Sequence, residues 1–131
     1  AGILYERGSA TYPELTGRAA ECFRKAGKWS RALFLNARVT DQKEKFRQRL
    51  GLLLDLERFE EVSKMEPRLR RLGLLDEDSM RYALGYAAFQ SGDFSNAEKW
   101  IAPIRDETTY QSVIRLREAM ASCKEEGWLC N

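Results

Sequence analysis

The sequence predicts an all-α protein, an α-solenoid built from antiparallel helix pairs. Capping boxes, in which Thr or Asp is followed three residues later by Glu or Gln, recur along the chain and mark helix starts. An aromatic residue follows each expected turn, at Trp29, Phe59 and Phe94, and these stand 30 and 35 positions apart. A period near 34 residues is typical of helix-turn-helix repeats. The composition, 44% hydrophobic and 32% charged with three prolines, suits an ordered helical chain.

The length of the chain favours a single domain. With 131 residues, the chain is long enough for one domain with its own core, so we expect residues 1–131 to form a single helical-repeat domain. The chain begins with neither methionine nor a signal-like segment, and we therefore expect a piece of a longer protein. No apolar run approaches the roughly 18 residues that a membrane span needs.

Charge is distributed unevenly along the chain. The net charge is only +2, but residues 1–40 carry seven basic and three acidic side chains, whereas residues 76–109 carry three basic and seven acidic ones. Such a gradient can orient a charged partner. It is equally compatible with a solvated surface that binds nothing.

The first pair is expected over about residues 12–39. Thr11 and Glu14 form a capping box, which predicts a helix that ends near Gly27. Trp29 then begins the second helix of the pair.

The second pair is expected over about residues 41–73. Asp41 and Glu44 form its capping box. Pro67 should kink or split the second helix, because it lacks a backbone N–H. Gly73 is expected to end that helix.

The third pair, about residues 77–105, is the clearest. Gly85 lies inside a helix, where glycine costs roughly 1 kcal/mol relative to alanine. Close approach of the partner helix explains it, with Ala97 as the small residue opposite. Gly92 marks the turn and Phe94 starts the second helix.

A terminal helix is expected over about residues 108–126, begun by a Thr108–Gln111 capping box. It should cover the last exposed apolar surface of the array, which repeat proteins require. Alternatively, it is the first helix of a fourth repeat. The expected apolar face consists of Val113, Leu116, Met120 and Cys123.

The three cysteines leave two alternatives open. Cys123 and Cys130 are close enough for a disulfide at the chain end, which would indicate an oxidising compartment. Otherwise all three are reduced thiols in a cytoplasmic protein. Cys22 is expected to be a buried thiol.

The three pairs resemble tetratricopeptide repeats, most closely in the third pair. The residues at the family's packing positions are Ala20, Trp29, Ala32, Leu50, Gly51, Phe59, Val62, Leu84, Gly85, Phe94 and Ala97. The family's usual terminal proline is missing from each pair. In that family, the first helices of successive repeats line a groove that binds protein segments. The resemblance implies that the groove residues here are Tyr82, Tyr86, Phe89, Gln90, Gln48, Leu52, Asp55, Glu21 and Arg24.

A narrower resemblance is to the periplasmic repeat region of Pel-type exopolysaccharide export porins of Gram-negative bacteria. The segments at 31–39, 48–50 and 69–75 carry it. It implies a periplasmic scaffold, attached to an outer-membrane protein, that docks a polysaccharide deacetylase/hydrolase.

We therefore expect a protein–protein interaction scaffold that is not an enzyme and has no catalytic, cofactor-binding or metal-binding residues. Histidine is absent, which removes the commonest general base and metal ligand. One alternative is a cytoplasmic adaptor. A second is a helical-repeat RNA-binding module, because residues 18–38 are basic. A third is direct polysaccharide binding through Tyr82, Tyr86 and Trp128. We expect no membrane contact by this segment, and self-association stays open.

Overall fold

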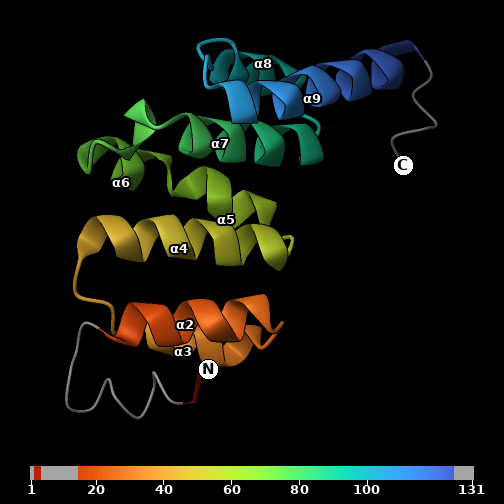
Figure 1. Cartoon of the computed structure of the whole chain (residues 1–131). Helices are drawn as coiled ribbons and strands as arrows, with labels where there is room; N and C mark the ends of the chain where they lie inside the picture. The colour runs from red at the N-terminus through yellow and green to blue at the C-terminus, as the bar shows by residue number, and fades with distance from the viewer. Residues whose placement is uncertain (1, 4–14, 126–131) are drawn as a thin grey trace. The chain divides into compact units, whose positions relative to one another are not determined.

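The computed structural model describes residues 2–3 and 15–125 (Figure 1). Regular secondary structure in this part of the chain is entirely helical, as predicted. Its elements are α2 (Thr16–Lys25), α3 (Trp29–Asn36), α4 (Gln42–Asp55), α5 (Phe59–Lys64), α6 (Glu66–Arg71), the 3₁₀ helix η2 (Leu74–Asp76), α7 (Asp78–Gln90), α8 (Phe94–Ile101) and α9 (Glu107–Glu125).

The chain forms two compact units, Ala1–Arg58 and Phe59–Asn131. Helices α2, α3 and α4 belong to the first unit, and α5 to α9 belong to the second. The boundary therefore lies inside the second pair that the sequence predicts, between its two helices.

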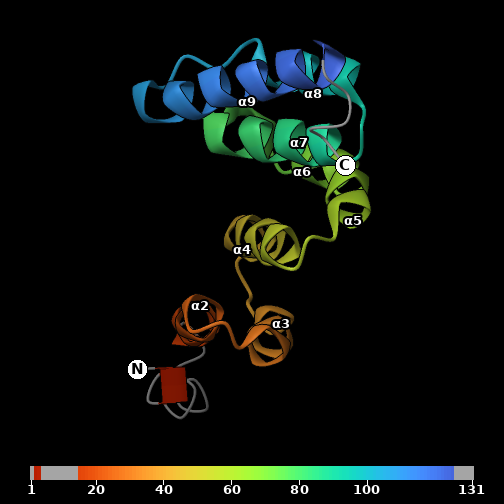
Figure 2. The same ribbon diagram turned by 90° about the vertical axis from the view of Figure 1, so that its right-hand side faces the viewer.

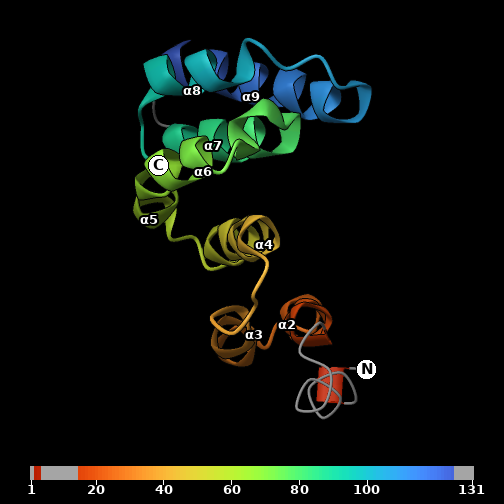
Figure 3. The same cartoon turned by 90° about the vertical axis from the view of Figure 1, so that its left-hand side faces the viewer.

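In the first unit, α2 and α3 lie side by side with α4 packed against them (Figures 2 and 3). Gly27, with a φ of 75°, ends α2 in the left-handed region that glycine adopts without strain. Six of the buried apolar side chains of this unit form one cluster. Its members are Ala19, Ala20, Phe23, Ala32, Leu35 and Leu52.

Aspartate side chains cap the start of α4, α8 and α9. The Asp41 carboxylate accepts a 3.0 Å hydrogen bond from the backbone N–H of Glu44, so this predicted cap is confirmed. The predicted Thr108 cap is wrong. Helix α9 begins one residue earlier, because Asp106 accepts hydrogen bonds from the backbone N–H of Thr109 and from the hydroxyls of Thr108 and Thr109. The Thr11–Glu14 box lies outside the described residues.

In the second unit, α7 and α8 form the closest contact, and α9 packs against α7 and α8. The close approach predicted at Gly85 is confirmed: a Cβ added there would lie 2.7 Å from Ile101 Cγ2 and 3.3 Å from the Ala97 carbonyl oxygen. The buried cluster of this unit consists of Ala88, Ala97, Ile101, Ile104, Val113, Leu116 and Met120.

The long second helix of the predicted second pair is split, as Pro67 indicates. Helix α5 ends at Lys64, and α6 begins at Glu66 with Pro67 in its first turn. Gly73, with a φ of 74°, follows the end of α6 as predicted.

Two of the residues expected at packing positions differ from the rest. Trp29 is 39% exposed, so its ring is only partly covered by the first unit. Gly51 is half-buried, and an added Cβ would meet the Arg24 guanidinium rather than a helix backbone. The other positions are buried or half-buried.

Candidate functional site

The residues predicted to line a groove fall into two sets, one in each unit. The first set lies on α2 and α4, and the second lies on α7. In the first set, the structure brings Arg24 together with two carboxylates. Its Nε atom lies 2.8 Å from Asp55 Oδ2, and its Nη1 atom lies 3.0 Å from Glu21 Oε1. One guanidinium therefore bridges α2 and α4 on a partly exposed face.

Gln48 lies among the residues around the space between α2 and α4, but its side chain is buried. Its Nε2 atom donates to the Gly17 carbonyl oxygen at 3.0 Å, and its Oε1 atom accepts from Asn36 Nδ2 at 3.0 Å. Asn36 also donates to the Lys45 carbonyl oxygen at 2.9 Å. Gln48 therefore joins α2, α3 and α4 from within.

The prediction that Leu52 lines a groove is wrong. Its exposed fraction is 0%, and it belongs to the buried cluster of the first unit. A fully buried leucine stabilises the unit and offers no surface to a partner.

A pocket of about 370 Å³ lies between α2 and α4. This volume is at the lower end of the range typical of ligand pockets. The lining mixes three arginines and two glutamates, so charged groups of both signs face the space. The lining residues are Gly17, Arg18, Glu21, Arg24, Glu44, Arg47 and Gln48.

The Glu44 carboxylate lies against the start of α2. A Cβ added at Gly17 would come within 2.7 Å of Glu44 Oε1. A carboxylate near the first turn of a helix is stabilised by the helix dipole. Glu44 therefore lies close to the first turn of α2 at this end of the pocket.

The second predicted set is half-buried aromatic surface. Tyr86 lies edge-on to Phe59 at 5.9 Å between ring centroids, and Tyr82 lies 6.2 Å from Tyr86. Phe89 stacks on Phe94 at 5.4 Å. The rings of Tyr82, Tyr86, Phe89 and Phe94 pack against the buried cluster of the second unit.

Burial raises the pKa of the Tyr82 hydroxyl above its ordinary value. Tyr82 is therefore neutral at physiological pH. Of the α7 residues predicted to contact a partner, Gln90 is exposed, while the three aromatic residues contribute mainly to packing.

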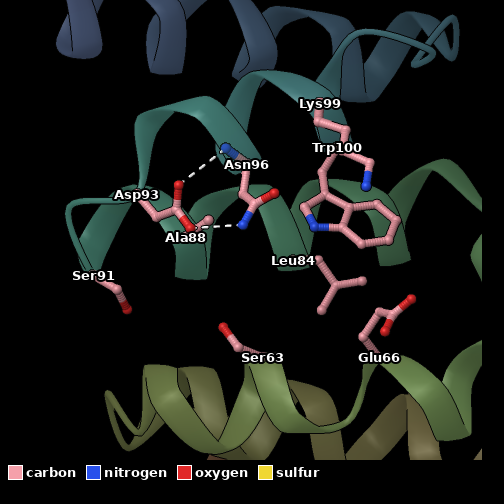
Figure 4. Close-up of a pocket in the computed structure, with 9 residues that line it drawn as sticks. All are labelled: Ser63, Glu66, Leu84, Ala88, Ser91, Asp93, Asn96, Lys99 and Trp100. Atoms are coloured by element: carbon pink, nitrogen blue, oxygen red, sulfur yellow. Dashed lines mark hydrogen bonds between the residues drawn. The ribbon is translucent and has the colours of Figure 1, made fainter.

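A second pocket, of about 310 Å³, lies in the second unit (Figure 4). Figure 4 shows the Trp100 indole standing beside Leu84, with Glu66 and Ser63 on the opposite side of the space. The Lys99 ammonium lies 5.8 Å from the centre of the Trp100 ring. The full lining consists of Ser63, Glu66, Leu84, Ala88, Ser91, Asp93, Asn96, Lys99 and Trp100.

The sequence alone does not predict this second pocket. Asn96, Lys99 and Trp100 stand at helical spacing on one face of α8, which is also the pattern of an ordinary solvated face. Their placement opposite the α5–α6 region depends on how the elements pack. Two polar side chains of the pocket already bind each other. The Asp93 carboxylate accepts hydrogen bonds from the backbone N–H of Asn96 at 3.2 Å and from Asn96 Nδ2 at 2.6 Å.

Cysteines and acidic residues form no metal-binding group in the described part of the chain. Cys22 is a half-buried free thiol. Cys123 is disulfide-bonded, and Cys130 lies outside the described residues, so the pairing of Cys123 with Cys130 stays a prediction.

Among the described helices, none combines the length and the apolar character that a membrane crossing requires. A comparison with protein-family models finds no match, and neither does a comparison with curated proteins or with solved structures.

Proposed function

We propose that this chain is a segment of a tetratricopeptide-like helical-repeat scaffold, and that the face shared by α2 and α4 docks another protein. The observation that carries the proposal is the pocket of about 370 Å³ between these two helices, lined by charges of both signs. Charged groups around such a site favour specificity and rapid association. The pairs α2–α3 and α7–α8, each joined by a turn with a glycine of positive φ, support the repeat interpretation.

By the resemblance in sequence, the proposed partner is a polysaccharide deacetylase/hydrolase, and the proposed setting is the periplasmic part of a Pel-type export protein. The scaffold itself would carry out no chemistry and need no cofactor. The alternative setting is a cytoplasmic adaptor.

An RNA-binding role has less support than protein docking. It would need the basic residues of α2 and α3 to meet phosphates. Arg24 already binds two carboxylates, those of Glu21 and Asp55. Its charge is therefore neutralised within the protein.

The test is calorimetric titration of the purified chain with the purified deacetylase/hydrolase of a Pel-type system. The variant Arg18→Glu/Arg47→Glu reverses two charges that line the pocket, one on α2 and one on α4. We expect it to weaken binding at least about tenfold, since like charges placed across an interface cost several kcal/mol.

The matched control is Lys25→Glu/Lys43→Glu, which makes the same charge change on exposed positions of the same two helices outside the pocket lining. It should bind within about twofold of the unaltered chain. Equal losses in both variants would contradict the assignment of the face. Absence of binding by the unaltered chain would contradict the proposed partner.

A further inference from the structure

Three turns of the chain have the same backbone hydrogen bonds: the turns that follow α2, α4 and α7. In each turn, the second residue after the helix has a positive φ, and its N–H donates to the carbonyl oxygen three positions earlier at 3.0 Å. The N–H of the next residue donates to the carbonyl oxygen five positions earlier, at 2.8–2.9 Å. This pair of bonds is a common way to end a helix. The residues with positive φ are Gly27, Glu57 and Gly92, at 75°, 57° and 81°.

The turn after α4 differs from the other two because its left-handed residue has a side chain. For such a residue, the left-handed region brings Cβ too close to the following carbonyl oxygen. In the part of the chain that the structure describes, Glu57 is the only residue other than glycine with a positive φ. Its side chain is exposed, so burial does not offset the strain. The turn after α4 is therefore strained, whereas its two counterparts are not.

The strained turn lies at the boundary between the two compact units, which falls between Arg58 and Phe59. Residues at the end of a helix often absorb the φ and ψ changes of a hinge. If Glu57 leaves the left-handed region, its strain is relieved and the N–H groups of Glu57 and Arg58 lose their acceptors. Both residues are exposed, so water can replace the lost hydrogen bonds at little net cost.

We propose that the turn after α4 is a conformational hinge. It exchanges between the closed form described above and an open form in which the φ of Glu57 is negative, while each compact unit stays folded. The turns after α2 and α7 stay closed, because glycine holds the left-handed conformation without strain. Such a hinge lets a scaffold adjust to the shape of a partner. The proposal does not depend on the docking face assigned to α2 and α4.

The first test is native-state hydrogen exchange of the full chain, followed by NMR for each backbone amide. The three turns serve as internal comparisons, because their hydrogen bonds are the same. We expect the protection factors of the Glu57 and Arg58 amides to be at least about fivefold below those of the equivalent amides in the two glycine turns. Equal protection in all three turns would overturn the proposal.

Two substitutions at position 57 should move the equilibrium in opposite directions. Glu57→Gly removes the strain and should raise the protection of the turn at least about fivefold. Glu57→Val should lower the protection further, because β-branched residues are rarely found at positive φ. The control is Glu77→Gly, the same chemical change at a residue whose φ is −87°. It should leave the protection of the turn after α4 unchanged.

A second measurement asks whether the two units move when the turn opens. Fluorescent dyes are attached at the exposed positions Ser30 and Ser95, one in each unit, through non-natural amino acids that leave the cysteines intact. Single-molecule energy transfer should show a minor conformer that Glu57→Val enriches and Glu57→Gly depletes, each at least about fivefold. Circular dichroism checks that every variant keeps its helices. The same distribution of energy transfer in all three proteins would overturn the proposal, and so would a Glu57→Gly protein whose turn is no better protected.

Discussion

Gly51 and Gly85 occupy the same kind of position in the sequence, the middle of the first helix of a predicted pair, yet they meet different neighbours. At Gly85 an added Cβ would strike Ile101 Cγ2 at 2.7 Å and the Ala97 carbonyl oxygen at 3.3 Å. At Gly51 it would strike the Arg24 guanidinium at 2.7–3.2 Å. Ile101 is fully buried and β-branched, whereas Arg24 is long and partly exposed.

The difference shows two ways to join helices. The contact of α7 with α8 depends on close packing of small and apolar groups that cannot move aside. The contact of α2 with α4 depends on polar side chains, which can adjust at the surface but are fixed where Gln48 is buried. Gly85 is required by the close packing of α7 and α8, whereas Gly51 only leaves room for the Arg24 side chain.

The largest expected effect is that of Gly85→Leu. Overpacking between α7 and α8 should lower the free energy of unfolding by about 3 kcal/mol, even though leucine favours helix more than glycine. Chemical denaturation followed by circular dichroism measures it. Gly51→Leu is the matched comparison and should cost much less. If both substitutions cost the same, the distinction between the two contacts is wrong.

Gln48→Ala tests the buried polar contact in the first unit. It leaves the Gly17 carbonyl oxygen without its side-chain donor and Asn36 without one acceptor, so the free energy of unfolding should fall by about 2 kcal/mol. Gln42→Ala, an exposed change on the same helix, should have almost no effect. If the Gln48→Ala protein were as stable as the Gln42→Ala protein, the hydrogen bonds of Gln48 would not stabilise the first unit.

Asp78 adds an electrostatic element to the second unit. Its Oδ2 atom accepts hydrogen bonds from the backbone N–H groups of Asp106 and Arg105, at 2.8 Å and 3.1 Å, and these bonds hold the pKa of its carboxyl below the ordinary 3.8. A lowered carboxyl pKa stabilises the folded state above the unfolded pKa, and this contribution is lost as the pH falls through the folded pKa.

The unaltered chain should therefore be more stable than the Asp78→Asn variant at neutral pH, and this difference in the free energy of unfolding should shrink as the pH falls below about 4. Urea denaturation at about pH 5 and about pH 3 measures the difference between the two proteins. Asp76→Asn, an exposed change nearby, serves as control. A difference that is the same at both pH values would argue against ionisation of Asp78 as its cause.

The smallest expected effect, of opposite sign, is that of Gly51→Ala. Alanine gains up to about 1 kcal/mol of helix propensity, and displacing the Arg24 side chain weakens ion pairs worth less than that. We expect a net gain of about 0.5 kcal/mol. In an Arg24→Ala background the gain should approach the full 1 kcal/mol. A loss of stability in that background would mean that another group occupies the space.

Local signals predicted the helices well, because caps and left-handed glycines act on their immediate neighbours. Asp41, Gly27 and Gly73 each mark a helix end in the structure as the sequence indicates. The Thr108 cap failed because Asp106, two residues earlier, caps the helix itself, accepting from the backbone N–H of Thr109 and from the Thr108 hydroxyl.

Surface assignments were less predictable, since they depend on which helix lies opposite. The repeat pattern could not show that Leu52 enters the core of the first unit or that Trp29 stays exposed at its rim. The pocket beside Trp100 likewise combines α8 with residues more than thirty positions earlier, such as Ser63.

The buried Asn36 amide has a consequence for how the first unit selects its fold. Asn36 Nδ2 reaches both the Lys45 carbonyl oxygen and Gln48 Oε1, two acceptors almost one turn apart on α4. If α3 slid along α4 by a turn, the amide would stay buried but lose both acceptors, at a cost of several kcal/mol. Apolar contacts alone would tolerate such a slip more easily. The asparagine thus selects one register among several that hydrophobic packing would accept.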